Sequence, residues 1–153
     1  MTKPTRSTAK IIPGEALPPL ERVFTAVDLV AYGAATWDWH RLHYDLEYAR
    51  SMKLPGVVVD GQAFGAVLAR AALDWAGPRA FITRLSFRMK SMAFAGDTLR
   101  AEGEVTAVRA LASGHLVVLA QRLTNAGRLT AEATTEIRLP SERRGPLSPS
   151  LRS

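Results

Sequence analysis

The chain has 153 residues, of which 47% are hydrophobic and 22% charged, and it contains no cysteine. One globular domain with a sizeable core is therefore expected, and disulfides and thiolate chemistry are excluded. The net charge of +6 is partly carried by the two chain ends, and the body lacks the basic, aromatic-rich stripe of a nucleic-acid interface. Because no long apolar run predicts a signal peptide or a membrane span, we expect a cytoplasmic protein that binds neither nucleic acids nor membranes.

Both ends of the chain have the composition of flexible tails. Residues 1–18 and 141–153 are rich in proline and in polar or basic residues. The body between them, residues 19–140, contains no internal repeat and no low-complexity block, so a single domain is predicted there.

The first part of this body predicts one strand and two helices. Residues 20–26 alternate enough for a strand, and residues 26–39 predict a helix with Asp28 capping its start or lying in its first turn. Residues 44–53 predict a second, short helix, which ends before the break Leu54-Pro55-Gly56.

The segment 61–77 is the most informative about the fold. Glycines bound it, and its only charged residues, Arg70 and Asp74, are four apart and therefore on one face. A helix that is apolar nearly all round, yet too short to span a bilayer, is expected to lie buried inside the protein. Its many small residues would let a sheet wrap closely around it.

Strand periodicity dominates the rest of the body. Residues 79–92 alternate clearly between apolar and polar residues, and turn residues separate three further predicted strands: 97–110, 115–128 and 129–140. The sequence Asn125-Ala126-Gly127 predicts a hairpin turn between the last two. One strand, several helices and then four strands predict an α+β fold: a single hotdog domain, in which an antiparallel sheet curls around the central apolar helix.

The stretch 36–45, TWDWHRLHYD, concentrates ionisable and aromatic side chains. Asp38 and His43 would form a general acid/base pair if they converged on one water molecule. A metal site is a second interpretation, with these candidate ligands: Asp38, His40, His43 and Asp45. A catalytic metal usually has three protein ligands and a supporting shell, and the only other histidine lies in a predicted strand. A third interpretation is a polar loop whose aromatic side chains, Trp37, Trp39 and Tyr48, pack on the core.

The order of motifs over residues 35–69 resembles the MaoC-type, (R)-specific enoyl-CoA hydratase ("hydratase 2") family. Members of that family show Asp-x-Asn-x-x-His, Tyr-Ala on a short helix, Pro-Gly, a run of small β-branched residues and a His-Gly that opens the central helix. The corresponding residues here are Asp38-Trp39-His40-Arg41-Leu42-His43, Tyr48-Ala49, Pro55-Gly56, Val57-Val58-Val59 and Asp60-Gly61. Residues 94–99, FAGDTL, match a further turn of the family, so the resemblance extends roughly over residues 20–140.

This resemblance implies an (R)-specific 2-enoyl-CoA hydratase, which in reverse is a 3-hydroxyacyl-CoA dehydratase. The substrate would be an acyl-CoA thioester, and neither a metal nor another cofactor would be needed. Asp38 and His43 would be the catalytic dyad, and the N–H of Gly61 would bind the thioester carbonyl at the start of the central helix.

Three further residues are candidates for substrate binding. His40 stands where the family has Asn, and Asp60 stands where it often has His. Asp60 can instead cap the central helix, and Phe64 lines an acyl tunnel or is part of the core.

The expected partners are further hotdog chains. Residues 73–89 and 103–108 resemble the small MaoC-like subunits of bacterial steroid side-chain degradation, some of which form heteromers. Since a lone hotdog leaves sheet edges exposed, we expect a homodimer, a higher oligomer or a heteromer with another MaoC-like chain. Two alternative functions stay open: a hotdog acyl-CoA thioesterase that uses Asp60, and a non-catalytic MaoC-like subunit of a heteromeric hydratase.

Overall fold

The computed structural model describes residues 11–141, so most of the two predicted tails, residues 1–10 and 142–153, lies outside it. Along the chain the elements are β1 (Leu20–Val23), α1 (Ala26–Thr36), the 3-10 turn η2 (Arg41–His43), α2 (Leu46–Ser51), α3 (Gly61–Ala76), β2 (Phe81–Met89), β3 (Thr98–Leu111), β4 (Gly114–Asn125) and β5 (Arg128–Pro140). The predicted succession of one strand, helices and four strands is confirmed, and η2 is an element that periodicity did not predict. Within residues 11–141, no helix is both long and apolar enough to cross a membrane.

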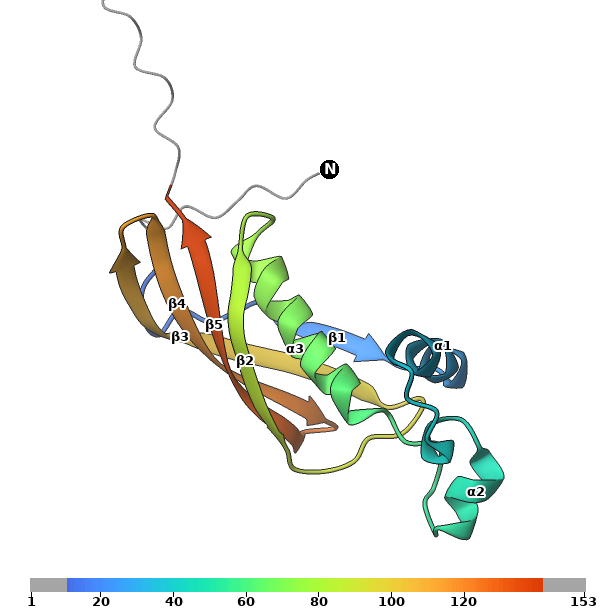
Figure 1. Cartoon of the computed structure of the whole chain (residues 1–153). Coiled ribbons are helices and arrows are strands. Elements are labelled where there is room, and N and C mark those ends of the chain that lie inside the picture. The colour runs from blue at the N-terminus through green and yellow to red at the C-terminus, as the bar shows by residue number, and fades with distance from the viewer. Residues whose placement is uncertain (1–10, 142–153) are drawn as a thin grey trace, which may run out of the picture.

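The five strands form one antiparallel sheet in the order β1-β3-β4-β5-β2. The hairpin between β4 and β5 has a loop of Ala126 and Gly127, both with positive φ, 47° and 79°. This is the backbone of the tight hairpin turn that the sequence predicts. Figure 1 shows the sheet curling around α3, which lies along its inner side. The α+β hotdog fold is therefore confirmed.

Helix α3 is the centre of the core because it has apolar side chains on almost every face. Phe64 and Leu68 are 2% and 0% exposed and pack in a cluster that includes residues of β3, β4 and β5. Trp75, near the other end of the helix, belongs to a second buried cluster. A polar link joins helix and sheet, since the buried Gln121 donates to the Leu68 carbonyl at 3.0 Å and accepts from the Thr135 hydroxyl at 2.6 Å. The helix is thereby fixed in register with the middle of the sheet.

Part of the predicted N-terminal tail, residues 11–18, packs against the domain, which the sequence analysis began at residue 19. Ile11 and Leu17 are 6% and 5% exposed and belong to the second cluster. The N–H of Leu17 donates to Gly103 O of β3 at 2.8 Å. The proline-rich composition of this segment predicted a flexible tail. Two apolar side chains that close one end of the core hold the segment in place.

Helices α1 and α2 lie beyond the N-terminal end of α3, away from the main body of the sheet (Figure 1). Thr25 and Asp28 form a capping box at the start of α1, and the Thr25 N–H and hydroxyl hold the pKa of Asp28 below its usual range. Asp45 caps α2 by accepting the Tyr48 N–H. This hydrogen bond lowers the pKa of Asp45 most, and the hydrogen bond from the Arg41 guanidinium lowers it further. The two helices thus begin at fixed points on either side of the loop that carries the polar stretch.

Candidate active site

Asp38 is held in place by the end of α1. Trp37 is the C-cap of this helix in the left-handed conformation (φ 62°), and the N–H of Asp38 donates to Gly33 O at 3.1 Å. A Cβ at Gly33 would lie 2.7 Å from the backbone oxygen of Asp38. The close approach of the loop to the helix therefore requires a glycine at position 33. The Oδ1 atom of Asp38 accepts from the His40 N–H at 3.1 Å.

His43 is half-buried, and its Nδ1 lies 2.8 Å from the carbonyl oxygen of Val58. Because a carbonyl oxygen only accepts, Nδ1 carries the proton, and Nε2 of the neutral ring keeps its lone pair. The backbone around Val58 is itself fixed, since its N–H donates to Leu42 O at 2.8 Å and the neighbouring Val59 N–H donates to Ala93 O at 2.8 Å. The imidazole is therefore held with Nε2 as the ring nitrogen that can accept a proton.

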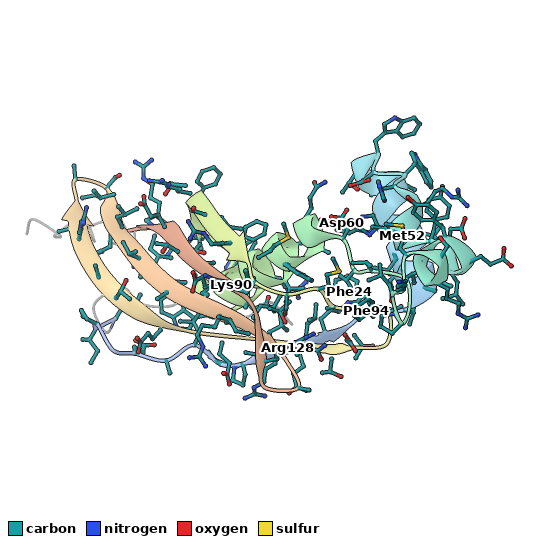
Figure 2. All side chains as sticks on the ribbon, turned by 90° about the horizontal axis from the view of Figure 1, so that it is seen from below. Phe24, Met52, Asp60, Lys90, Phe94 and Arg128 are labelled. Carbon is teal, nitrogen blue, oxygen red and sulfur yellow. The ribbon has the colours of Figure 1, made fainter. Side chains whose placement is uncertain are left out.

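Asp60 is 5% exposed, and it caps α3 by accepting the Gln62 N–H on Oδ1 at 2.7 Å. The predicted capping role of Asp60 is confirmed. The other oxygen, Oδ2, is fully enclosed and has no hydrogen-bond partner among the described residues. Figure 2 shows Asp60 at the end of α3 that faces α1 and α2. Burial, and next the negative charge of Asp60, raise the pKa of Tyr32 on α1.

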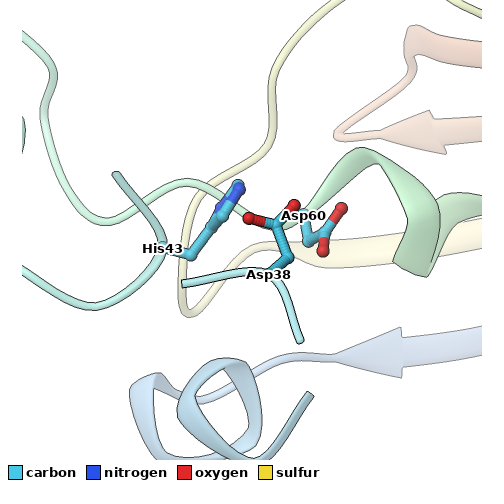
Figure 3. Close-up of side chains that lie close together, drawn as sticks. All are labelled: Asp38, His43 and Asp60. Atoms are coloured by element: carbon cyan, nitrogen blue, oxygen red, sulfur yellow. The ribbon is translucent and has the colours of Figure 1, made fainter. Parts of the chain in front are cut away.

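Asp38, His43 and Asp60 come together in one cluster (Figure 3). One potential ligand atom of each residue lies within 4.8 Å of those of the other two. Two carboxylates and an imidazole with a free lone pair can hold a water molecule, take a proton from it and return that proton to a bound molecule. The same atoms can hold a cation. The structure thus joins the two predicted dyad residues and adds Asp60 to them.

His40 has a local structural role next to this cluster. Its Nδ1 accepts the Leu42 N–H at 3.3 Å and so caps η2, a bond that an Asn side-chain oxygen also makes at such positions. Its ring lies edge-on to the His43 ring, with the centroids 6.1 Å apart. A histidine at position 40 therefore preserves the cap that the Asn of the family pattern would provide.

Gly61 begins α3, where the first N–H groups of a helix have no partner within the helix. The Met89 side chain, which comes from β2, lies directly against the Gly61 Cα, so a Cβ at position 61 would overlap its sulfur atom. Met89, a flexible and largely exposed side chain, thus lies next to the Gly61 backbone, where the family resemblance places the thioester carbonyl, and it would move aside for a bound thioester. Phe64, a predicted substrate-binding residue, lies within the hydrophobic core.

The aromatic residues of the polar stretch are placed differently from the third interpretation, which packed them on the core. Trp37 and Trp39 are 81% and 45% exposed. Their rings contact one another edge-to-face, and Trp39 contacts Tyr44 in the same way. The prediction is therefore wrong for Trp37 and Trp39, whereas Tyr48 is half-buried, with the Arg41 guanidinium over its ring.

Sequence reasoning missed two residues that build the site. Gly33 gives no motif signal because one glycine in a helical pattern suggests only a weakened helix. Val58 acts through its carbonyl oxygen, which no side-chain pattern can reveal. Gly33 could have been found from its place one helical turn before the polar stretch, whereas the contact of Val58 depends on tertiary structure.

Gly33→Ala is expected to displace Asp38 and leave the rest of the fold in place. The added methyl group would press on the Asp38 backbone oxygen, whereas Gly56→Ala, in a nearby loop, would place its Cβ at an ordinary 3.8 Å from Phe94. We expect about a 10-fold or larger loss of turnover for Gly33→Ala, as a displacement of about 1 Å produces. Turnover of both variants, with circular dichroism as the check on folding, measures the effect. Equal activity of the two would contradict the role of Gly33.

Comparison with known proteins agrees with this fold. The model of the family described as "MaoC like domain" matches residues 8–126. The beta subunit of 3-oxo-4,17-pregnadiene-20-carboxyl-CoA hydratase from Mycobacterium tuberculosis is 32% identical to the chain over 95 residues, which are 62% of this chain and 74% of that subunit.

Solved structures show the same likeness. The ChsH1-ChsH2 complex from Mycobacterium tuberculosis contains a chain that matches with a TM-score of 0.76 and 28% identity, covering 84% of this chain and 98% of that one. The R-hydratase PhaJ1 from Pseudomonas aeruginosa matches with a TM-score of 0.79 and 26% identity, covering 88% and 85%. Since the family model covers most of the chain and these structures share its hotdog fold, the chain belongs to the family of MaoC-like domains.

Proposed function

We propose that the chain is a catalytically competent (R)-specific 2-enoyl-CoA hydratase, which in the reverse direction is a 3-hydroxyacyl-CoA dehydratase. The observation that carries this proposal is the orientation of His43: its Nδ1 is bound to Val58 O, which leaves Nε2 without a hydrogen bond to the residues that the structure describes, and one ring nitrogen of His43 lies within 4.8 Å of an Asp38 carboxylate oxygen. The likeness to R-hydratase PhaJ1 supports the same reaction. No metal or other cofactor is required by this mechanism.

In the proposed reaction, a water molecule lies between Asp38 and His43. His43 Nε2 takes one proton from the water while Asp38 accepts a hydrogen bond from the other, and the water oxygen bonds to the β-carbon of the enoyl thioester. The double-bond electrons move to the α-carbon and the thioester oxygen, where the Gly61 N–H and the positive end of α3 stabilise the negative charge. His43 then gives its proton to the α-carbon, so that one water is added in full.

The proposed partner is a second hotdog chain. One relative is a hydratase beta subunit, and a matching structure is the ChsH1-ChsH2 complex, which favours a heteromer with another MaoC-like chain over a homodimer. The name of the same relative makes a bulky, steroid-type acyl-CoA thioester the first substrate to test, with crotonyl-CoA as a small reference.

Hydration and hydrolysis can be measured on the same sample. We expect the absorbance of the conjugated enoyl thioester to fall without release of free CoA thiol, and a dehydrogenase specific for (R)-3-hydroxyacyl-CoA to accept the product. Thiol release without hydration would instead indicate the thioesterase alternative, with Asp60 as its acidic residue. Neither reaction, for the chain alone or with a co-purified hotdog partner, would indicate a non-catalytic subunit.

A further inference from the structure

Each side chain of the Asp38–His43–Asp60 cluster is fixed by the backbone at one polar atom. Asp38 Oδ1 accepts from the His40 N–H, His43 Nδ1 donates to Val58 O, and Asp60 Oδ1 accepts from the Gln62 N–H. One oxygen or nitrogen atom per residue remains available, and one potential ligand atom of each residue lies within 4.8 Å of those of the other two. A set of side chains oriented in this way is typical of metal ligands held by an outer shell.

The charge of the cluster also favours a cation. Only 5% of Asp60 is exposed, and its enclosed Oδ2 has no hydrogen-bond partner among the described residues. Within residues 11–141, no lysine or arginine forms an ion pair with Asp38 or Asp60. Two ionised carboxylates at this distance repel one another, and the enclosed Oδ2 of Asp60 has no hydrogen bond to replace its lost hydration, although Oδ1 accepts the Gln62 N–H. A divalent cation between them would remove both penalties.

We propose that Asp38, His43 and Asp60 bind one divalent transition-metal ion, with Zn²⁺ as the best match, and that the bound ion stops hydration. An imidazole nitrogen with two carboxylate oxygens suits zinc or cobalt, whereas magnesium and calcium prefer oxygen ligands alone. Of the four candidate ligands in the sequence-based metal interpretation, only Asp38 and His43 belong to the cluster, and Asp60 takes the place of His40 and Asp45. Three protein ligands leave a fourth position for water.

The inhibitory effect follows from the atoms that the ion would use, and this part rests on the proposed hydratase activity. A metal ion takes the lone pair of His43 Nε2 and one oxygen of Asp38, which are the acceptors of the water protons in the proposed reaction. With those acceptors occupied, the base that removes a proton from water is lost. The metal-binding part does not depend on which reaction the chain catalyses.

Titration of metal-free protein with Co²⁺ tests binding directly, because tetrahedral or five-coordinate Co²⁺ absorbs visible light. We expect saturation at one Co²⁺ per chain, and displacement of the spectrum by Zn²⁺. Asp60→Asn keeps the helix cap, since Asn caps as well as Asp, but it removes the charged ligand. Asp60→Asn should weaken Co²⁺ binding by more than about 100-fold. Loss of an outer-shell partner costs up to about 100-fold in metal affinity, and loss of a direct ligand should cost more. His43→Ala should do the same.

Asp74→Asn is the matched control, since Asp74 lies near the other end of α3 and pairs with Arg70 on the surface. It should bind Co²⁺ like the parent protein. The metal site is overturned if the parent protein gives no Co²⁺ spectrum, if Asp60→Asn binds as tightly as the parent, or if Asp74→Asn is weakened equally. Circular dichroism of each variant shows that the fold is intact.

Hydration of the enoyl-CoA substrate tests the inhibition. One equivalent of Zn²⁺ should lower the rate by more than about 100-fold, in line with the loss of a general base, and EDTA should restore it. If Zn²⁺-loaded protein hydrates as fast as metal-free protein, the inhibition is wrong although the site stands. If metal-free protein shows no hydration, the proposed function fails, and the Co²⁺ titration still decides the metal site.

Discussion

Asp38→Asn and His43→Ala are each expected to lower kcat for enoyl-CoA hydration by about 100- to 10,000-fold, which is the usual contribution of general acid–base catalysis. Asn in place of Asp38 can still accept the His40 N–H through its amide oxygen, so the loop should keep its shape while the charge is lost. Alanine in place of His43 removes the only imidazole in the cluster. KM should change much less than kcat, because neither side chain is proposed to bind the CoA portion.

Steady-state kinetics on metal-free protein, with Asp74→Asn and His115→Ala as matched controls, provide the measurement. Asp74 is in a surface ion pair and His115 lies at the start of β4, so both controls should turn over like the parent chain. A variant of Asp38 or His43 that keeps more than about a tenth of the parent kcat would contradict the dyad. Loss of a general acid or base is expected to lower kcat by at least about 100-fold. The chain would then fit the non-catalytic subunit alternative better.

Phe64→Ala is expected to lower the free energy of unfolding by about 3–5 kcal/mol, the usual cost of truncating a buried phenylalanine. Phe64 is 2% exposed at the centre of the larger core cluster, where its ring packs among residues of the helix and the sheet. Removing the ring leaves a cavity between them. Since a whole domain is stabilised by only about 5–15 kcal/mol, this loss is a large fraction of the total.

Urea denaturation followed by circular dichroism measures this loss. Phe81→Ala is the matched control, because Phe81 is 68% exposed and its truncation should change stability by no more than about 0.5 kcal/mol. A loss below about 1 kcal/mol for Phe64→Ala, far under the range for a core ring, together with a raised KM, would instead support the predicted role of Phe64 as a wall of the acyl site.

Much of the fold could be predicted because its signals are local. The packing of residues 11–18 was not predicted because proline and polar residues separate Ile11 from Leu17, and such a composition gives no sign that the two side chains are buried. The composition of a segment averages over all its residues, whereas one or two buried side chains are enough to hold that segment against the core.

The candidate site was predicted in part. Ordered motifs indicated Asp38 and His43, and the cap at Asp60 followed from its place before an apolar helix. The approach of Asp60 to the other two depends on how the loop after α1 turns back toward α3, and this is set by Gly33 and by backbone bonds of residues 57–59. The exposure of Trp37 could not be read from the sequence either, because a large aromatic residue is usually buried.

The segment from Val57 to Gly61 connects the parts of the candidate site more tightly than any side-chain contact does. It supplies the carbonyl that orients His43, and it then continues directly into the carboxylate of Asp60 and the first N–H of α3. A substitution elsewhere in the sheet that moves this segment would carry all three groups along together. The groups of the candidate site would therefore keep their mutual spacing even where the surrounding side chains diverge.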